Sequence, residues 1–271
     1  MSDAKRPQSM NEEARGASAM HWPAQLIVVR HGQSAGNVAR DEAHRTDADR
    51  IGLTVRDADV PLSDLGRDQA IALGRWFAER PEEHRPDVLL SSPYLRACQT
   101  ADLFRAHGGA PSDAPICFDE RLREKEFGIL DGLTTGGIHR TFPEQAEFRR
   151  LLGKFYHRPP GGESWCDVIL RLRSVLDTIS LHYAGRRVII FSHQVIVLCL
   201  RYIIENLSET EILAIDKEGD VANCAITEYL YQPDAGRGGG LVLQRYNVTA
   251  PLEADATPVT SAPDAIAGAR G

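Results

Sequence analysis

The chain has 271 residues, of which 42% are hydrophobic and 25% charged, as is usual for a soluble globular protein. Its 31 basic and 38 acidic side chains give a net charge of −7, which excludes a general basic surface for nucleic acid or an anionic membrane. The most apolar stretch, 188–204, is interrupted by polar residues and predicts no membrane span. The five cysteines form no C-x-x-C pair and no signal peptide is evident, so we expect a cytoplasmic protein with free thiols.

Both ends of the chain differ in composition from its middle. Residues 1–23 are polar and aperiodic, and residues 248–271 are rich in Ala, Thr, Pro and Asp without an aromatic residue. Such segments bury too little apolar surface to order themselves. Residues 24–247 contain no repeat and no long linker. We therefore predict one domain over 24–247 between two disordered tails, 1–23 and 248–271.

The first half of this domain predicts strands separated by helices. The apolar run Gln25–Arg30 is typical of a buried parallel strand, whereas the polar stretch Ala39–Asp59 predicts a long loop. Ser63 stands where a helix N-cap is expected, ahead of apolar residues at helical spacing. A second apolar run, Val88–Ser91, predicts another buried strand, and Pro93 lies in the turn that opens the next helix.

The second half continues the alternation. A helix is expected after Gly161-Gly162, a third apolar strand over Arg187–Ser192, and an apolar helix from there to about Asn206. Two closing strands follow, at 225–230 and 241–244. This pattern predicts an α/β domain whose parallel or mixed sheet is covered on both faces. Ligands in such domains bind beyond the carboxyl ends of the strands.

Histidines and arginines occur where the predicted strands end. His31 follows Arg30 at the end of the first strand, His193 follows the third, and Arg96 lies in the first turn of the helix after the second. If the three strands are neighbours, these side chains converge on one rim. A guanidinium offers two parallel donors that match phosphate oxygens, and a neutral imidazole can attack phosphorus. The residues therefore predict phosphoryl transfer with His31 as the nucleophile.

Five short motifs carry a resemblance to a known family. They are R-H-G-Q-S-x-x-N at 30–37, S-S-P-x-x-R-A-x-Q-T-A at 91–101, L-x-E-x-x-F-G-x-x-x-G at 122–132, G-G-E-S at 161–164 and S-H-Q at 192–194. In this order they resemble the histidine phosphatase superfamily, in its branch of phosphoglycerate mutases and fructose-2,6-bisphosphatases. The resemblance covers about residues 26–229. It implies a three-layer α/β/α sandwich with a mostly parallel mixed sheet, and chemistry without a metal or other cofactor.

The resemblance also implies roles for individual residues. His31 matches the phosphate-accepting histidine, and Glu124 matches the proton donor. Arg30, Arg96 and His193 match the groups that hold the phosphoryl oxygens. Two further candidates for the substrate pocket lie on the first motif: Ser34 and Asn37.

A second set of candidates concerns the rest of the substrate. Arg150 and Lys154 match positions where the bisphosphatases hold a second phosphate, and Gln194 agrees with their S-H-Q motif. Leu198, however, replaces an arginine of those enzymes, which argues against fructose 2,6-bisphosphate itself. The K-E-F-G run at 125–128 replaces the R-H-Y-G of the mutases, which favours hydrolysis over transfer. The sequence thus predicts a metal-independent phosphomonoester hydrolase that acts on a small phosphorylated metabolite through a phosphohistidine.

Three alternatives remain open at this stage. The first is phosphoglycerate mutase-type transfer, and the second is a phospho-ligand-binding domain without turnover. The third is a serine hydrolase, because residues 32–36 fit G-x-S-x-G around Ser34 directly after a strand. That strand is the first of the chain, however, and no oxyanion segment precedes it. The other seven histidines lack metal-ligand spacing, and we expect them at the surface: His21, His44, His84, His107, His139, His157 and His182.

Overall fold

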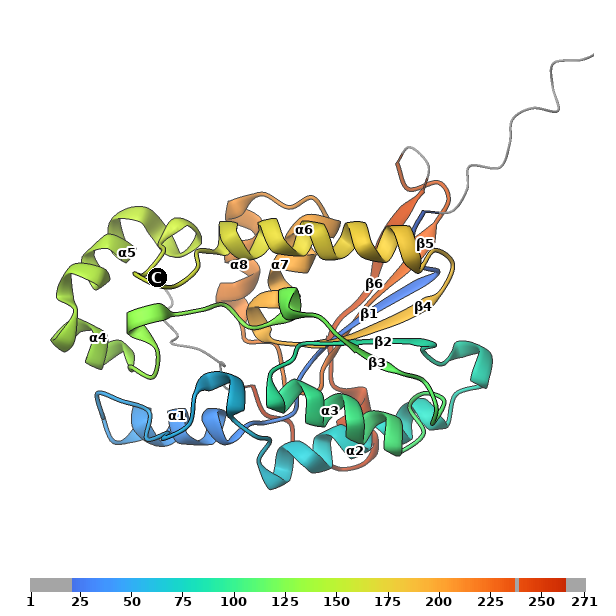
Figure 1. Cartoon of the computed structure of the whole chain (residues 1–271), viewed down its shortest axis with the longest axis horizontal. Coiled ribbons are helices and arrows are strands. Elements are labelled where there is room, and N and C mark those ends of the chain that lie inside the picture. Colours follow the sequence, from blue (N-terminus) through green and yellow to red (C-terminus); the bar gives the residue numbers. More distant parts are fainter. Residues whose placement is uncertain (1–20, 237–238, 262–271) are drawn as a thin grey trace, which may run out of the picture.

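The computed structural model describes residues 21–236 and 239–261 and contains a mixed sheet with helices on both faces (Figure 1). In sheet order the six strands are β3 (Ile116–Phe118), β2 (Val88–Ser91), β4 (Arg187–Ser192), β1 (Gln25–Arg30), β5 (Ile226–Gln232) and β6 (Gly240–Val248). β1 to β4 run parallel, whereas β5 is antiparallel to both of its neighbours, β1 and β6. The predicted mostly parallel mixed sheet is confirmed.

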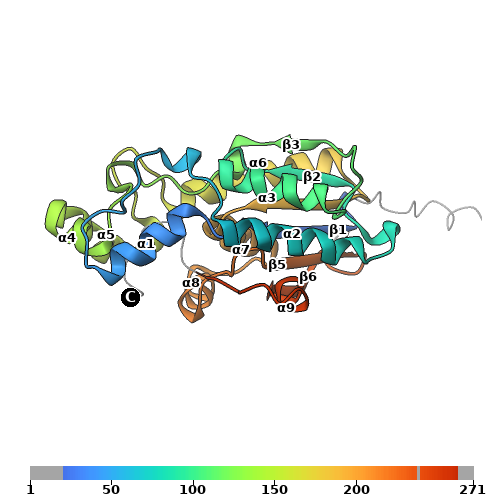
Figure 2. The same ribbon diagram turned by 90° about the horizontal axis from the view of Figure 1, so that it is seen from below.

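Helices cover the sheet as two separate layers. Leu26 and Val28 of β1 belong to one apolar core, and Ile27 and Val29 belong to the other, because successive strand residues point to opposite faces. The first core is closed by α6 (Trp165–His182), α7 (Gln194–Ile204) and α8 (Glu209–Glu218). The second is closed by α2 (Asp64–Ala78), α3 (Leu95–Ala106) and α9 (Ala250–Ala254). Figures 1 and 2 show the resulting three-layer sandwich, as predicted.

A third group of helices lies beyond the sheet. It comprises α1 (Ala35–Arg45), which follows β1, together with α4 (Thr135–Thr141) and α5 (Pro143–Tyr156), at the left of Figure 1. A small apolar cluster around Leu130, Leu133 and Ile138 packs this region. Short 3-10 helices connect the elements: η1 (Asp57–Asp59), η2 (Glu82–His84), η3 (Glu120–Leu122) and η4 (Gly128–Leu130). Within the described ranges, none of the helices is long and apolar enough to cross a membrane.

Serine side chains begin several of the helices. Ser63 accepts from the backbone N–H of Gly66 at 3.0 Å, which confirms it as the N-cap of α2. Three other serines form capping boxes with the third residue of their helix: Ser34 on α1, Ser164 on α6 and Ser208 on α8. Such caps satisfy N–H groups that have no partner inside the helix.

Two predictions from composition are wrong. The stretch Ala39–Asp59 is not one long loop, because α1 extends to Arg45 and turns its polar residues Asn37 and Arg40 inward. Because the buried face of this helix carries polar side chains, the helix lacks the apolar periodicity from which helices are predicted. At the other end, residues 248–261 are ordered: Val248 completes β6, and Leu252 of α9 is fully buried in the second core. Residues 1–20 and 262–271 of the predicted tails lie outside the described residues.

Candidate active site

The strand order decides which side chains meet. β4 lies between β1 and β2, so residues that follow these three strands share one rim. The rings of His31 and His193 lie edge to face with centroids 5.2 Å apart, and Nε of Arg96 lies 3.2 Å from Nε2 of His31. Arg30 ends β1 and donates to the carbonyl of Val221. All four predicted rim residues are buried, and the structure brings both histidines and Arg96 into contact.

The hydrogen bonds of His31 define its protonation state. Nδ1 lies 2.6 Å from the carbonyl oxygen of Gly32, which can only accept a hydrogen bond. On the other side of the ring, Nε2 faces the guanidinium of Arg96, which can only donate. Both partners therefore require the neutral tautomer with the proton on Nδ1. The lone pair of Nε2 then points toward Arg96, as a nucleophile beside a phosphate-binding group needs.

Glycine is required where the His31 loop meets α2. A Cβ atom on Gly32 would lie 2.3 Å from the carbonyl oxygen of Gly66, and one on Gly66 would lie 1.9 Å from that of Gln33. Gly32 also donates its N–H to Thr100 Oγ1 at 3.1 Å. Backbone therefore packs directly on backbone here. Gly32 thus allows the close approach of helix α2.

The S-S-P motif holds the second histidine. Nε2 of His193 lies 2.8 Å from the hydroxyl of Ser92, and the ring of Tyr94 contacts it edge to face at 5.3 Å. Tyr94 in turn donates its hydroxyl to Glu126 at 2.6 Å. Burial, together with this bond to Glu126, raises the pKa of Tyr94 far above its ordinary value, so the phenol stays protonated.

An acidic residue of η1 completes the environment of Arg96. Nη1 of Arg96 donates to the main-chain oxygen of Asp57 at 2.6 Å, and Nη2 donates to its carboxylate at 3.0 Å. Together with the Nε contact to His31, these bonds use all three nitrogens of the guanidinium. Asp57 lies in the stretch 39–59, which we expected to be a long loop, and its contact with Arg96 was not predicted.

Glu124 lies on a segment that the G-G-E-S motif holds in place. Its carboxylate is buried and accepts from the N–H of Lys125 at 2.7 Å. Glu163 of the motif accepts from Glu126 N at 3.0 Å and from Arg171 at 2.9 and 3.0 Å, and Arg171 donates to the carbonyl of Glu124 at 3.2 Å. Burial acts to raise the pKa of Glu163, but the bonds and charge of Arg171, the N–H of Glu126 and the charge of Arg123 together lower that pKa. The motif thus anchors the backbone of the predicted proton donor.

Several predicted substrate-binding residues have other partners. Ser34 and Asn37 are buried and bind each other at the start of α1. Lys154 forms an ion pair with Asp216 of α8, and Gln194 donates to Asp220 at 2.8 Å. These four residues and Arg150 were predicted from the family resemblance. The resemblance does not specify hydrogen bonds between side chains, so these partners were not predicted.

Arg150 lies at the surface of its helix. Its side chain is 69% exposed and pairs with Glu147 one turn earlier on α5. Arg150 and Lys154 nevertheless line a cavity of about 610 Å³ between α4, α5 and α8. Arg149 lines the same cavity and is more buried than Arg150.

Three basic side chains near this cavity were missed by the sequence analysis. Burial lowers the pKa of Lys125 to about 8, and the charge of Arg149 contributes. Burial also lowers the pKa of Arg149 itself. His157, which we expected at the surface, is only 4% exposed, and its pKa is lowered by burial and by the charges of Arg149 and Lys125. In the sequence, these basic residues were indicated only by the position of Lys125 directly after Glu124.

The fold and the rim define an α/β protein whose histidines and arginines meet at the carboxyl edge of a parallel sheet. The family model for the histidine phosphatase superfamily (branch 1) matches residues 26–247. The chain therefore belongs to the histidine phosphatase superfamily, which confirms the family that its five motifs predict.

Relatives of the chain include both phosphatases and mutases. It is 31% identical over 179 residues to 6-phosphofructo-2-kinase/fructose-2,6-bisphosphatase of Caenorhabditis elegans, a match to 66% of this chain and 33% of that one. The chain thus spans about a third of the length of this relative. It is 28% identical over 240 residues to 2,3-bisphosphoglycerate-dependent phosphoglycerate mutase 2 of Gloeobacter violaceus, which covers 87% of this chain and 98% of the mutase.

Solved structures show the same fold. A mycobacterial glucosyl-3-phosphoglycerate phosphatase is similar with a TM-score of 0.62 at 25% identity, covering 83% of this chain and 99% of that one. The α-ribazole phosphatase of Shigella flexneri has a TM-score of 0.65 at 20% identity and covers 83% and 96% of the two chains. The latter similarity supports the fold alone.

Proposed function

We propose that this protein is a metal-independent phosphomonoester hydrolase that acts through a phosphohistidine formed on His31. The observation that carries the proposal is the pair of contacts to His31. Gly32 holds the proton on Nδ1, and Arg96 faces the lone pair on Nε2 at 3.2 Å. A neutral imidazole whose Nε2 lone pair is directed at an arginine is arranged to attack a phosphorus atom that the same arginine holds.

The proposed reaction has two steps. The dianion of a phosphomonoester binds with its phosphoryl oxygens between Arg30, Arg96 and His193 and takes the place of the contact between Arg96 and His31. Nε2 of His31 then attacks phosphorus in line with the leaving oxygen, and Glu124 gives its proton to the departing alkoxide. In the second step Glu124 accepts a proton from water, which attacks the phosphohistidine and releases inorganic phosphate. Most of the catalysis comes from positioning and charge stabilisation.

The basic residues near Glu124 support a substrate with a second anionic group. Apart from the effect of burial, the charge of Arg149 lowers the pKa of Lys125, and the charges of Arg149 and Lys125 lower that of His157, so the three side chains lie close together. Like charges gathered in a partly buried region are destabilising until an anion neutralises them. We therefore assign the substrate to small metabolites that carry a phosphomonoester and a second phosphate or carboxylate. Of the arginines that line the adjoining cavity, Arg149 is the more buried and extends this region, whereas Arg150 is exposed and paired with Glu147.

Phosphoglycerate mutase-type transfer is the second candidate, and the match to almost the full length of a bacterial mutase favours it. It uses the same phosphohistidine, but a second substrate oxygen replaces water in the second step. Exclusion of water from the site decides between the two outcomes.

The test compares wild type with His31→Ala on para-nitrophenyl phosphate and on sugar phosphates and phosphoglycerates, in EDTA. His182→Ala is the matched control, because this histidine is exposed at the end of α6. We expect phosphate release that survives EDTA, is lost in His31→Ala and is retained in the control. An acid-labile phosphoenzyme should form in wild type and in the control, but not in His31→Ala.

Other outcomes separate the alternatives. An isomerised product without phosphate release would establish the mutase. Tight binding of a phosphoester without any turnover would establish a binding domain. Activity retained in His31→Ala would overturn the proposed nucleophile.

A further inference from the structure

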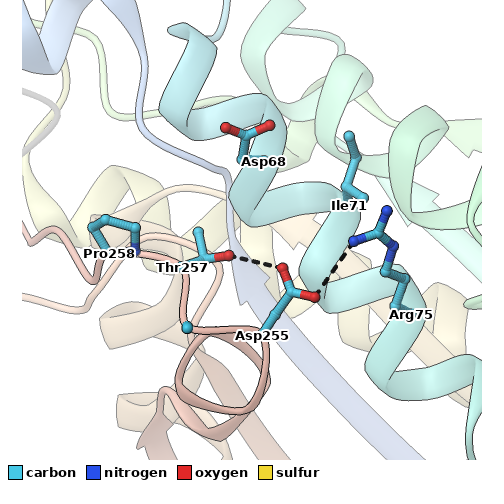
Figure 3. A pocket seen from close by; sticks show the side chains of 7 residues that line it. Asp68, Ile71, Arg75, Asp255, Thr257 and Pro258 are labelled. Carbon is cyan, nitrogen blue, oxygen red and sulfur yellow. Dashed lines mark hydrogen bonds and ion pairs between the residues drawn. The ribbon is translucent and has the colours of Figure 1, made fainter.

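The C-terminal segment Thr249–Ser261, which we call the C-terminal strap, packs against α2. Leu252 anchors it in the second core, and the strap then runs along the helix. Figure 3 shows Asp255 between Arg75 of α2, at 3.4 Å, and Thr257 of the strap, at 3.0 Å. A cavity of about 320 Å³ lies between the two segments here. Beyond Pro258 the strap approaches the residues behind His31.

Thr260 is the point where the strap binds the domain most closely. Its carbonyl accepts from the backbone N–H of Asn223 at 2.8 Å, and its hydroxyl donates to the side-chain Oδ1 of the same residue at 2.9 Å. The hydroxyl also accepts from Nε2 of Gln69 at 3.0 Å, and that nitrogen donates to the carbonyl of Pro258 at 2.9 Å. The side chains of Gln69 and Asn223 are fully buried. One threonine therefore joins two buried amides.

The other ends of these amides hold the loop of the nucleophile. Nδ2 of Asn223 donates to the carbonyl of His31 at 2.9 Å, and Oε1 of Gln69 accepts from the N–H of Gln33 at 2.8 Å. Because these backbone groups have fixed roles, each amide can take only one orientation, with its remaining atom toward Thr260. The strap is thus linked to the peptide groups on both sides of Gly32.

We propose that the C-terminal strap, through Thr260, is a positioning element for the nucleophile of this enzyme. The carbonyl of Gly32 holds Nδ1 of His31, so a displacement of this loop displaces the imidazole. Arg96 and His193 belong to α3 and to the residue after β4, and the side-chain bonds given for them above run to His31, Asp57 and Ser92. Loss of the link therefore lowers kcat more than it raises KM. The inference rests on the proposed role of His31 as nucleophile.

The first test compares Thr260→Val with Thr257→Val. Both substitutions remove a threonine hydroxyl from the strap. The hydroxyl of Thr257, however, donates to the exposed carboxylate of Asp255 and not to a buried amide. A displacement of reacting atoms by about 1 Å reduces rates by about 100-fold, so we expect kcat of Thr260→Val to fall by about tenfold or more. KM should stay within about twofold of wild type, as phosphate binding does not depend on this loop alone. Thr260→Ser keeps the hydroxyl and should retain wild-type kcat.

A second measurement is independent of turnover. Amide hydrogen exchange over residues 30–34 should be faster in Thr260→Val than in Thr257→Val, and unchanged in Thr260→Ser. If wild type hydrolyses no phosphoester, the proposed function fails, while the exchange rates still test the strap. Equal kcat and equal exchange in the two valine variants would overturn the proposal. If neither Thr260→Val nor Thr260→Ala folds, the strap is needed for the fold rather than for the nucleophile, and the proposal is also overturned.

Discussion

The guanidinium of Arg96 donates to Asp57 through both terminal nitrogens, at 2.6 Å to the main-chain oxygen and 3.0 Å to the carboxylate. Arg96 is 2% exposed at its side chain and Asp57 36%. These nitrogens are the parallel donors that suit two oxygens of a phosphate. A carboxylate of η1 thus fixes the orientation of the arginine, and under the proposed function it would also compete with the phosphate for these donors.

Asp57→Asn should strengthen inhibition by inorganic phosphate. The substitution removes a negative charge beside Arg96 but keeps the main-chain contact and an amide oxygen for Nη2. A tenfold change in a binding constant corresponds to about 1.4 kcal/mol. Loss of a modest repulsion between Asp57 and phosphate should therefore lower Ki by about three- to tenfold. The measurement is Ki for phosphate, with Asp59→Asn as control, since Asp59 pairs with the exposed Arg56. Weaker inhibition in Asp57→Asn would show that orienting Arg96 is the dominant effect of the carboxylate.

Glu124→Gln should affect substrates according to their leaving group. Removal of a general acid lowers rates by about 10²- to 10⁴-fold when the leaving alkoxide needs a proton. Nitrophenolate leaves without protonation, so hydrolysis of para-nitrophenyl phosphate should decline far less than that of a sugar phosphate. Glu126→Gln is the control, because this side chain is half-exposed and accepts from Tyr94. An equal loss on both substrates would contradict the role of Glu124 as proton donor.

Two adjacent arginines should differ in their contribution to substrate binding. Arg149→Met should raise KM for a phosphoglycerate by about tenfold or more, since hydrogen bonds to charged groups contribute about 1.5–3 kcal/mol. KM for glycerol phosphate, which lacks the second anion, should stay unchanged. Arg150→Met should alter neither value, because Arg150 is exposed and paired with Glu147. The same KM change in both variants would argue against a second anion bound at Arg149.

Lys125→Met should stabilise the protein at neutral pH. Burial and Arg149 lower the pKa of Lys125 to about 8, whereas an unfolded lysine has a pKa of about 10.4. Between these values the unfolded chain binds more protons, so the contribution of Lys125 to the free energy of unfolding rises with pH. Below pH 8 the charged form is buried at its full cost, up to about 3 kcal/mol.

The free energy of unfolding in urea at pH 7 and pH 10 measures this effect. The free energy of unfolding of Lys125→Met should exceed that of wild type at pH 7, and the difference between them should shrink toward pH 10. Lys217→Met, at an exposed position of α8, should show no such pH dependence. A difference that grows with pH would contradict the lowered pKa.

The sequence by itself determined three of the parallel strands, the start of α2 and the family. The bounds of β1, β2 and β4 agree with the predicted apolar runs, and Ser63 caps α2 as expected. These features depend on neighbours within a few residues, so a linear pattern carries them. The motifs add the family, and three of the five lie where those strands end.

Only the tertiary structure decided which side chains meet around these motifs. Arg149 and Arg150 are identical in type and adjacent in the chain, and the packing of α5 alone turns one inward and exposes the other. Thr260 looks like part of a polar tail, yet it binds Asn223, which holds His31. Contacts between residues so far apart in sequence form only when the sheet order and the helix layers bring the segments together. No local pattern contains that information, because the same residues serve equally well in a solvated loop.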